Sequence, residues 1–346
     1  MSQAVKKHRR VALAALLAMV LALTIAACGG GSSSTVAESG AGELSEMTEA
    51  TLVLDYIPNA VHAGIYQAVE AGYYEEEDIK LKIIQPTSTS DTLKLIDAGK
   101  AQFGIADGLD VATQIVEGRE AEGIMALLEE PPAGLITLKK SGITSPKELE
   151  GKTVGITGVP SDTATLNTIV SSAGGNPENV KVVTIGYNGV QDLENGKVSA
   201  FTGFVQADGV QVEHDGFPIE PFPLAENGGP SYPGLVVFST GKRVEEEPAL
   251  MQAFVNATIK GYEDVLKEPE AGIEALVNQN KGINESLAKE SLAAYMPLFT
   301  GKASSFGMIE PSAIEELSEF MVKNELSEKS FTPAEYGTDK FVENAG

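Results

Sequence analysis

The feature that most constrains the fold is a regular alternation of short β-branched runs with helical stretches, which begins at residue 51. Strand-like runs at residues 51–55, 79–84 and 103–106 are separated by segments with helical patterning and glycine ends. Strands that alternate with helices form parallel sheets covered by helices, so the pattern predicts an α/β fold. A chain of 346 residues, 42% of them hydrophobic, is long enough for two cores of ordinary size.

A second α/β series opens at residue 145, where Ser145, Pro146 and Glu148 predict a helix start with a capping box and proline in its first turn. Further strand-like runs follow at residues 153–156, 181–185 and 200–204. After residue 241 the chain becomes helical, with apolar residues at three- and four-residue spacing. These last helices are expected to pack on the first lobe.

Two similar segments lie between the two series: GLIT at residues 134–137 and GLVV at residues 234–237. Two antiparallel crossings of this kind are typical of a hinge between α/β lobes, and the alternative is a pair of unrelated strands with a common motif. The hinge interpretation gives a first lobe of residues 50–137 and 235–346 and a second lobe of residues 138–234.

The N-terminal segment has the pattern of a secretory signal. Residues 1–27 carry basic groups near their start and no acidic ones. Residues 11–27 are uncharged, and the length of this run is marginal for crossing a bilayer core of about 30 Å. The run ends at Cys28, the sole cysteine, in a context that resembles the bacterial lipobox. We therefore expect lipidation at Cys28 and a flexible tether over residues 28–49, which would hold the protein at a membrane outside the cytoplasm. An ordinary cleaved signal is the alternative.

Charge and rare residues exclude several classes of function. The formal net charge is -24, which disfavours nucleic acid and anionic lipid surfaces as partners. One cysteine permits no internal disulfide, and three histidines, at residues 8, 62 and 214, make a multi-histidine metal site unexpected. No metal and no cofactor is expected.

The candidate site follows from the rule that open α/β sheets bind ligands outside the carboxyl ends of their strands. The loops there contain at least six carboxylates and no Lys or Arg, so sulfonate, nitrate and phosphate ligands are disfavoured. A neutral or cationic amino-substituted heteroaromatic fits better, with Asp107 or Asp110 and Asp208 accepting from its amine. The polar and aromatic residues in these loops are Tyr56, Asn59, His62, Thr87, Ser88, Ser90, Asp107, Asp110, Glu129, Glu130, Ser161, Asp162, Thr163, Tyr187, Asn188, Gln206, Asp208 and Tyr232. Asp162 is expected to be mainly a helix cap.

The segment LDYIPNAVHAGIY at residues 54–66 resembles the opening motif of substrate-binding proteins in the thiamine-pyrimidine family, which serve ABC importers. The resemblance continues through LKKSGITSPKELEGKTVG at residues 138–155 and GKVSAFTGF at residues 196–204. Two departures concern the ligand: Tyr56 stands where Trp is common, and FVQAD at residues 204–208 replaces a common Tyr-Trp-Asn-x-Glu stretch. The resemblance implies these cleft residues: Tyr56, Asn59, His62 and Tyr66 from the first lobe, and Ser161, Thr163, Tyr187 and Phe204 from the second.

The resemblance also implies the fold and the function. We expect a type II periplasmic-binding-protein fold, with two doubly wound α/β lobes joined by a two-segment hinge. The expected function is a monomeric, lipid-anchored, extracytoplasmic solute-binding protein that delivers a thiamine pyrimidine precursor to an ABC permease. Alternatives are a sulfonate, nitrate or riboflavin binder and a surface lipoprotein that binds another protein. Related fungal pyrimidine synthases would need a Lys for pyridoxal phosphate and a Cys-rich iron-binding segment, so an enzyme is not expected.

Overall fold

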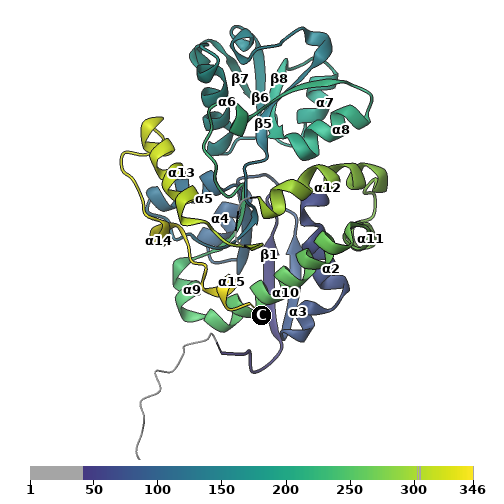
Figure 1. Cartoon of the computed structure of the whole chain (residues 1–346), viewed down its shortest axis with the longest axis vertical. Coiled ribbons are helices and arrows are strands. Elements are labelled where there is room, and N and C mark those ends of the chain that lie inside the picture. Colours follow the sequence, from purple (N-terminus) through teal and green to yellow (C-terminus); the bar gives the residue numbers. More distant parts are fainter. Residues whose placement is uncertain (1–41, 302, 304, 346) are drawn as a thin grey trace, which may run out of the picture. The chain divides into compact units, whose positions relative to one another are not determined.

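The computed structural model describes residues 42–301, 303 and 305–345. In this part the chain forms two lobes, each built on a five-stranded mixed sheet with helices on its faces (Figure 1). The expected signal peptide, Cys28 and most of the expected tether lie outside the described residues. Within the described part, no helix combines the length and the apolar character needed to cross a membrane.

The first sheet has the strand order β2-β1-β3-β10-β4. Strands β2, β1 and β3 are parallel, whereas β10 is antiparallel to both β3 and β4. Its elements are β1 (Thr48–Val53), β2 (Ile79–Ile84), β3 (Phe103–Ala106), β4 (Glu122–Leu128) and β10 (Leu235–Ser239), with η1 (Ala60–His62), α2 (Ala63–Glu70), α3 (Tyr73–Glu76), α4 (Asp91–Asp97) and α5 (Gly108–Val116) between them. The alternation seen in the sequence therefore corresponds to real strand–helix units.

The second sheet has the order β7-β6-β8-β5-β9, in which β6 is parallel to β7 and β8 while β5 is antiparallel to β8 and β9. Its strands are β5 (Ala133–Leu138), β6 (Thr153–Ile156), β7 (Lys181–Thr184), β8 (Ala200–Phe204) and β9 (Ile219–Pro223). The connecting elements are η2 (Lys139–Ser141), η3 (Pro146–Leu149), α6 (Pro160–Ser172), η4 (Pro177–Asn179), α7 (Gly189–Glu194), the π-helical η5 (Val205–Gly209), α8 (Val210–His214) and η6 (Leu224–Glu226). The capping box at Ser145 and Glu148 is present at the start of η3.

The sheet pairing moves the expected lobe boundary. Strand β5, assigned to the end of the first lobe by the hinge interpretation, is a central strand of the second sheet and pairs along its whole length with β8 or β9. All six of its residues are buried, so both faces of this strand are covered. The chain therefore passes between the sheets at residues 129–132 and 224–234.

The C-terminal third is helical: α9 (Gly241–Glu246), α10 (Pro248–Lys267), α11 (Pro269–Gln279), α12 (Glu285–Thr300), α13 (Pro311–Lys323), α14 (Pro333–Tyr336) and α15 (Lys340–Glu343). Helix α10 packs on the first lobe, where Phe254 stacks on Phe103 of β3 with ring centroids 3.9 Å apart. Its Gly261 lies so close to α2 that a Cβ there would stand 2.1 Å from the carbonyl oxygen of Gly64. Glycine is needed at this helix crossing.

Helix α12 differs from the expectation that these helices pack on the first lobe, because it also contacts the second. The Ser291 hydroxyl donates to the Gln206 carbonyl at 2.7 Å, and His214 Nδ1 lies 3.1 Å from Glu290 Oε2. These contacts form a further connection between the lobes, beside the two chain crossings.

Candidate ligand-binding site

A cavity lies between the lobes, at the carboxyl ends of the parallel strands of both sheets, as the strand-end rule predicts. Loops after β1, β3 and β6 contribute to its wall together with β8 and η5. The lining residues are Asp55, Tyr56, Asn59, Thr89, Leu93, Ile105, Ala106, Asp107, Asp110, Ala133, Thr157, Val159, Ser161, Asp162, Thr165, Thr202, Gly203, Phe204, Ala207 and Asp208. Among these described residues are five aspartates and no Lys, Arg or His.

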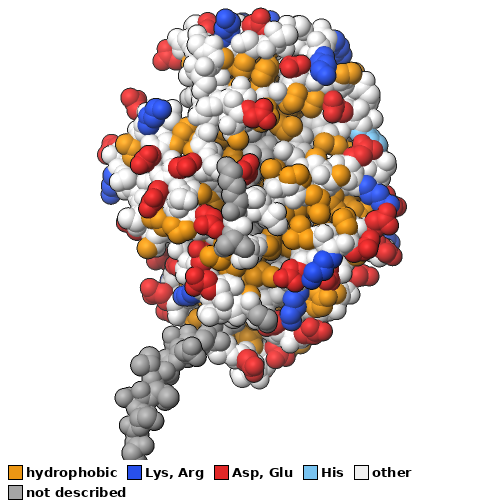
Figure 2. Space-filling model, viewed as in Figure 1, with side chains coloured by type: hydrophobic (Ala, Val, Ile, Leu, Met, Phe, Trp, Pro, Cys, Tyr) orange, Lys and Arg blue, Asp and Glu red, His pale blue; other side chains and the backbone are white. Residues whose placement is uncertain are grey.

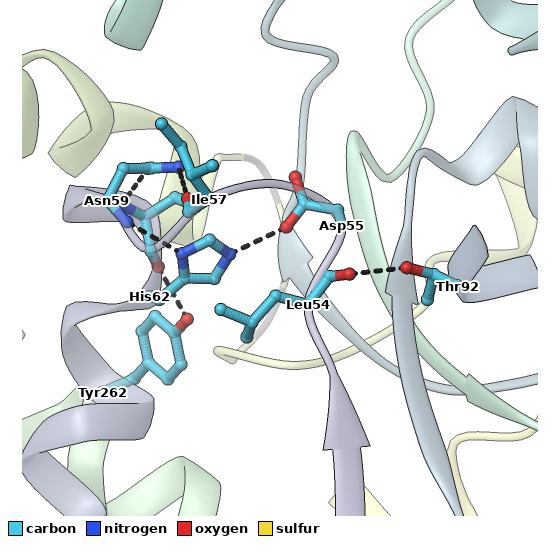
Figure 3. A network of polar contacts seen from close by, with 8 residues as sticks. Leu54, Asp55, Ile57, Asn59, His62, Thr92 and Tyr262 are labelled. Atoms are coloured by element: carbon cyan, nitrogen blue, oxygen red, sulfur yellow. Dashed lines mark hydrogen bonds and ion pairs between the residues drawn. The ribbon is translucent and has the colours of Figure 1, made fainter. Parts of the chain in front are cut away.

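Asp55 is held by a buried histidine (Figure 3). His62 Nδ1 accepts the backbone N–H of Asn59 at 3.2 Å, and since a backbone N–H can only donate, the proton of the neutral ring is on Nε2. Nε2 then donates to Asp55 Oδ1 at 2.7 Å. His62 is fully buried and does not line the cavity, so it positions Asp55. The other oxygen of Asp55, Oδ2, takes no part in this bond.

The loop around Asn59 is closed by its own hydrogen bonds. Asn59 Oδ1 accepts from the Val61 N–H at 3.0 Å and Nδ2 donates to the Ile57 carbonyl at 3.0 Å, so that Asn59 caps η1. Tyr262 of α10 donates to the Val61 carbonyl at 2.7 Å from below (Figure 3). The Asn59 side chain thus supports the loop while lining the cavity.

Asp107 and Asp110 stand on the first turn of α5, and protein donors bind both carboxylates. Asp107 caps α5 by accepting the Leu109 N–H at 2.8 Å, and the Tyr232 hydroxyl donates to it at 3.2 Å. Asp110 accepts from Ser161 of the second lobe, the backbone N–H to Oδ1 at 2.9 Å and the hydroxyl to Oδ2 at 2.8 Å. Both aspartates are therefore engaged inside the protein before any ligand is considered.

Asp162 fills the cap position expected for it and also lines the cavity. Its Oδ2 accepts from the Thr157 hydroxyl and from the N–H groups of Gly158 and Val159, and its Oδ1 accepts from the Thr202 hydroxyl at 2.7 Å. Gly158 has φ +113°, a conformation that favours glycine and permits this turn.

The second lobe adds Asp208 and the aromatic part of the wall. Asp208 Oδ2 accepts the Phe204 N–H at 2.9 Å, and a Cβ at Gly203 would stand 2.6 Å from the same oxygen, so a larger residue at Gly203 would displace this carboxyl group. Tyr56 contacts Tyr187 edge to face across the lobes, with ring centroids 4.6 Å apart. Tyr187 also donates to the Pro86 carbonyl at 3.3 Å.

Burial shifts the acid–base behaviour of this cluster. It raises the pKa of Asp110 to about 7 and that of Asp208 to about 6, against the opposing effect of the hydrogen bonds from Ser161 and Phe204. The pKa of Asp107 lies well above its usual range because the carboxyl is buried and close to Asp110. Near neutral pH the cavity therefore carries less negative charge than five ionised aspartates would give.

The structure places seven of the predicted ligand-binding residues on the cavity wall: Tyr56, Asn59, Asp107, Asp110, Ser161, Phe204 and Asp208. The other five do not line it. Thr163 is exposed on the outer face of α6, and Tyr66 is buried in the first-lobe core. His62, Tyr187 and Tyr232 each contact a lining residue from behind.

Several lining residues are absent from the predicted ligand set, among them Asp55, Thr89, Thr157, Thr165 and Thr202. Asp55 ends one predicted strand and Thr157 directly follows another, so both stand at strand ends, which is the signal used for the others. Thr165 stands four residues after Ser161, on the same helix face, whereas Thr163 does not. Thr89 lies in the same predicted loop as Ser88 and Ser90, whereas Thr202 lies within a predicted strand and has no comparable signal.

Comparison with known proteins agrees with this architecture. The family model described as NMT1/THI5 like matches residues 59–272. The chain belongs to the NMT1/THI5-like family. The matched range spans much of both lobes of this NMT1/THI5-like protein and confirms the resemblance based on residues 54–66, 138–155 and 196–204.

Two curated relatives carry different descriptions. The chain is 28% identical over 271 residues to a formylaminopyrimidine-binding protein of Halalkalibacterium halodurans, covering 77% of this chain and 82% of the relative. It is 29% identical over 253 residues to a 4-amino-5-hydroxymethyl-2-methylpyrimidine phosphate synthase of Legionella pneumophila, with 72% and 79% covered. The relatives of this NMT1/THI5-like protein therefore include one that is named as a binding protein and one that is named as an enzyme.

A solved structure supports the fold. The alkanesulfonate-binding protein SsuA of Xanthomonas axonopodis pv. citri, bound to MOPS, superposes with a TM-score of 0.69 at 12% identity, over 86% of this chain and all of that one. The NMT1/THI5-like protein thus has the periplasmic-binding-protein fold, with the two α/β lobes expected from the sequence.

Proposed function

We propose that the protein is an extracytoplasmic solute-binding protein of an ABC importer, and that its ligand is a small neutral or cationic heteroaromatic such as a formylaminopyrimidine. The observation that carries the proposal is the cavity wall, where five aspartates and two aromatic side chains meet with no Lys, Arg or His among the described lining residues. The named ligand of the Halalkalibacterium relative supports the same class of compound.

The wall offers the contacts that an aminopyrimidine needs. Tyr56 and Phe204 supply aromatic faces for a planar ring, at about 0.5–1.5 kcal/mol per ring pair beyond area burial. Asp55 and Asp208 offer carboxylates to an exocyclic amine, in bonds of about 1.5–3 kcal/mol each. Protein donors engage both carboxylate oxygens of Asp107 and of Asp110, whereas His62 bonds to Oδ1 of Asp55, so the first-lobe contact falls to Asp55 in this proposal.

The same wall disfavours the anionic alternatives. A sulfonate or nitrate placed there would meet carboxylates at short range, and this repulsion is strong in a cavity of low dielectric constant. On the face shown in Figure 2, acidic side chains are spread over both lobes. The formal charge of -24 likewise disfavours an anionic partner.

Transport requires three further elements that belong to the proposal. Cys28 would carry the lipid anchor, the lobes of a monomer would close about residues 129–132 and 224–234, and the closed form would dock on the permease. Closure would be driven only by the ligand's higher affinity for the closed state. Replacement of Cys28 by Ser should move the protein from the membrane fraction to the soluble fraction, and unchanged membrane association would contradict the anchor.

Catalysis is the second candidate, because one relative is named as a synthase. We place binding first, since the described cavity residues include no Lys to form an imine with pyridoxal phosphate. Incubation with pyridoxal phosphate and sodium borohydride should leave the mass of the protein's cavity peptides unchanged. A reduced adduct on a cavity peptide would favour the synthase.

The binding proposal is tested by thermal shift of the purified protein. The panel is a formylaminopyrimidine, an aminopyrimidine, thiamine, riboflavin, a polyamine and ethanesulfonate. A ligand at a hundredfold excess over its dissociation constant should stabilise the protein by about 2.7 kcal/mol. Stabilisation by the aminopyrimidines is expected, and stabilisation by ethanesulfonate alone would refute the charge argument.

A further inference from the structure

Helix α6 begins at the cavity, and its N-terminus is bound by an acid from the other lobe. Ser161, the second residue of this 13-residue helix, donates both its N–H (2.9 Å) and its hydroxyl (2.8 Å) to Asp110 of α5. Ser161 is 7% exposed and Asp110 is 3% exposed, so water does not compete strongly for these bonds. The carboxylate is held at two points, as a bound oxyanion would be.

The N-terminus of a helix is the place where this kind of lobe would bind an anion, because N–H groups and the helix dipole point there. In this protein the donors at that place are already bound to carboxylates. The N–H groups of Gly158 and Val159 bind Asp162, and the N–H of Ser161 binds Asp110. An anionic ligand would have to displace the protein's own acid and then lie beside it.

We propose that Asp110 is a specificity-determining residue: a built-in carboxyl group that occupies the N-terminus of α6, excludes acidic solutes from the cavity and ties the lobes together. The proposal rests on the proposed function, because it assumes a ligand that places no acidic group at the N-terminus of α6. The residue acts through Ser161 and makes no ligand contact in this role.

The contact also joins the lobes. Two other hydrogen bonds between the lobes link uncharged groups, Thr89 to Thr157 at 3.2 Å and Tyr187 to the Pro86 carbonyl at 3.3 Å. The Asp110–Ser161 pair adds a buried carboxyl group bound at both oxygens by two donors, and these bonds are strengthened further when the group is ionised. Asp110 thus supplies, within the protein, a contact between the lobes that an anionic solute bound to Ser161 would otherwise make.

The test compares Asp110→Ala with Asp208→Ala, using ethanesulfonate as the probe in isothermal titration calorimetry. Both variants remove one cavity carboxylate, but only Asp110→Ala frees the donors of Ser161. We expect Asp110→Ala to bind ethanesulfonate about tenfold or more tightly than the unmodified protein and than Asp208→Ala. Equal gains in both variants would show that overall charge alone excludes anions and would overturn the proposal, as would no gain in a folded Asp110→Ala.

If Asp110→Ala does not fold, Asp110→Ser is measured in the same way and interpreted by the same criteria. A second readout needs no ligand: small-angle scattering of the ligand-free variant should give a larger radius of gyration than the unmodified protein, because the tie between lobes is lost. An unchanged radius would contradict that part of the proposal. These results are separable from the proposed function, which fails when the unmodified protein binds no aminopyrimidine.

Discussion

Replacement of His62 tests whether the loop after β1 is organised as the structure indicates. The imidazole is fully buried and bonded on both nitrogens, to the Asn59 N–H and to the Asp55 carboxylate. His62→Ala removes a bond to a carboxylate, about 1.5–3 kcal/mol, and a bond from a backbone N–H, about 1 kcal/mol. The vacated space adds a cavity penalty, so we expect the free energy of unfolding to fall by about 3–5 kcal/mol in total.

The assay is urea unfolding followed by far-UV circular dichroism, with His214→Ala as the matched control. His214 bonds to Glu290, whose side chain is 49% exposed, and such a contact contributes about 0–1 kcal/mol. A loss for His62→Ala below about 1 kcal/mol, or one equal to that of His214→Ala, would refute the account of this loop.

Three further predictions concern packing, aromatic contacts and pH. Gly261→Ala should lower the free energy of unfolding by about 1–3 kcal/mol, because its Cβ would meet the Gly64 carbonyl; an unchanged urea midpoint would contradict this. Tyr187→Phe should keep most of the ligand affinity, whereas Tyr187→Ala should weaken it further by removing the ring against Tyr56, and equal affinities in titration calorimetry would contradict that difference. Burial raises the pKa of Asp110 from 3.8 to about 7 and that of Asp208 from 3.8 to about 6. Between pH 3.8 and about 7 the folded state therefore binds more protons than the unfolded state. The contribution of both groups should therefore make the protein less stable as the pH rises from about 4 to about 7, and Asp110→Asn should flatten the urea-midpoint profile; an identical profile would count against the shift.

The sequence predicts the architecture well, because the signals behind it are local. Strand–helix alternation places most strands of both sheets within a residue or two of their observed bounds; β1 begins three residues before the predicted run, and β9 has no predicted counterpart. The lobe boundary at residue 137 was wrong, since the partners of β5 are β8 and β9, far along the chain. The two crossings share a sequence motif, but a motif does not reveal which sheet a strand joins.

The sequence predicts the location of the candidate site and its acidic character, but it predicts the individual lining residues less well. Strand ends locate the cavity and its aspartates because parallel strands bring their carboxyl ends together. Whether a side chain faces the cavity or the core depends on packing between distant elements: Tyr66 of α2 is buried in a core cluster that also contains residues of α10. The pairing of Asp110 with Ser161 joins two lobes and has no signature in the sequence.

The most direct test of the central claim is titration calorimetry of the purified protein with a formylaminopyrimidine and, separately, with ethanesulfonate. We predict saturable one-to-one binding of the pyrimidine, weakened in Asp208→Asn, and no measurable binding of the sulfonate. Binding of ethanesulfonate without binding of the pyrimidine would contradict it.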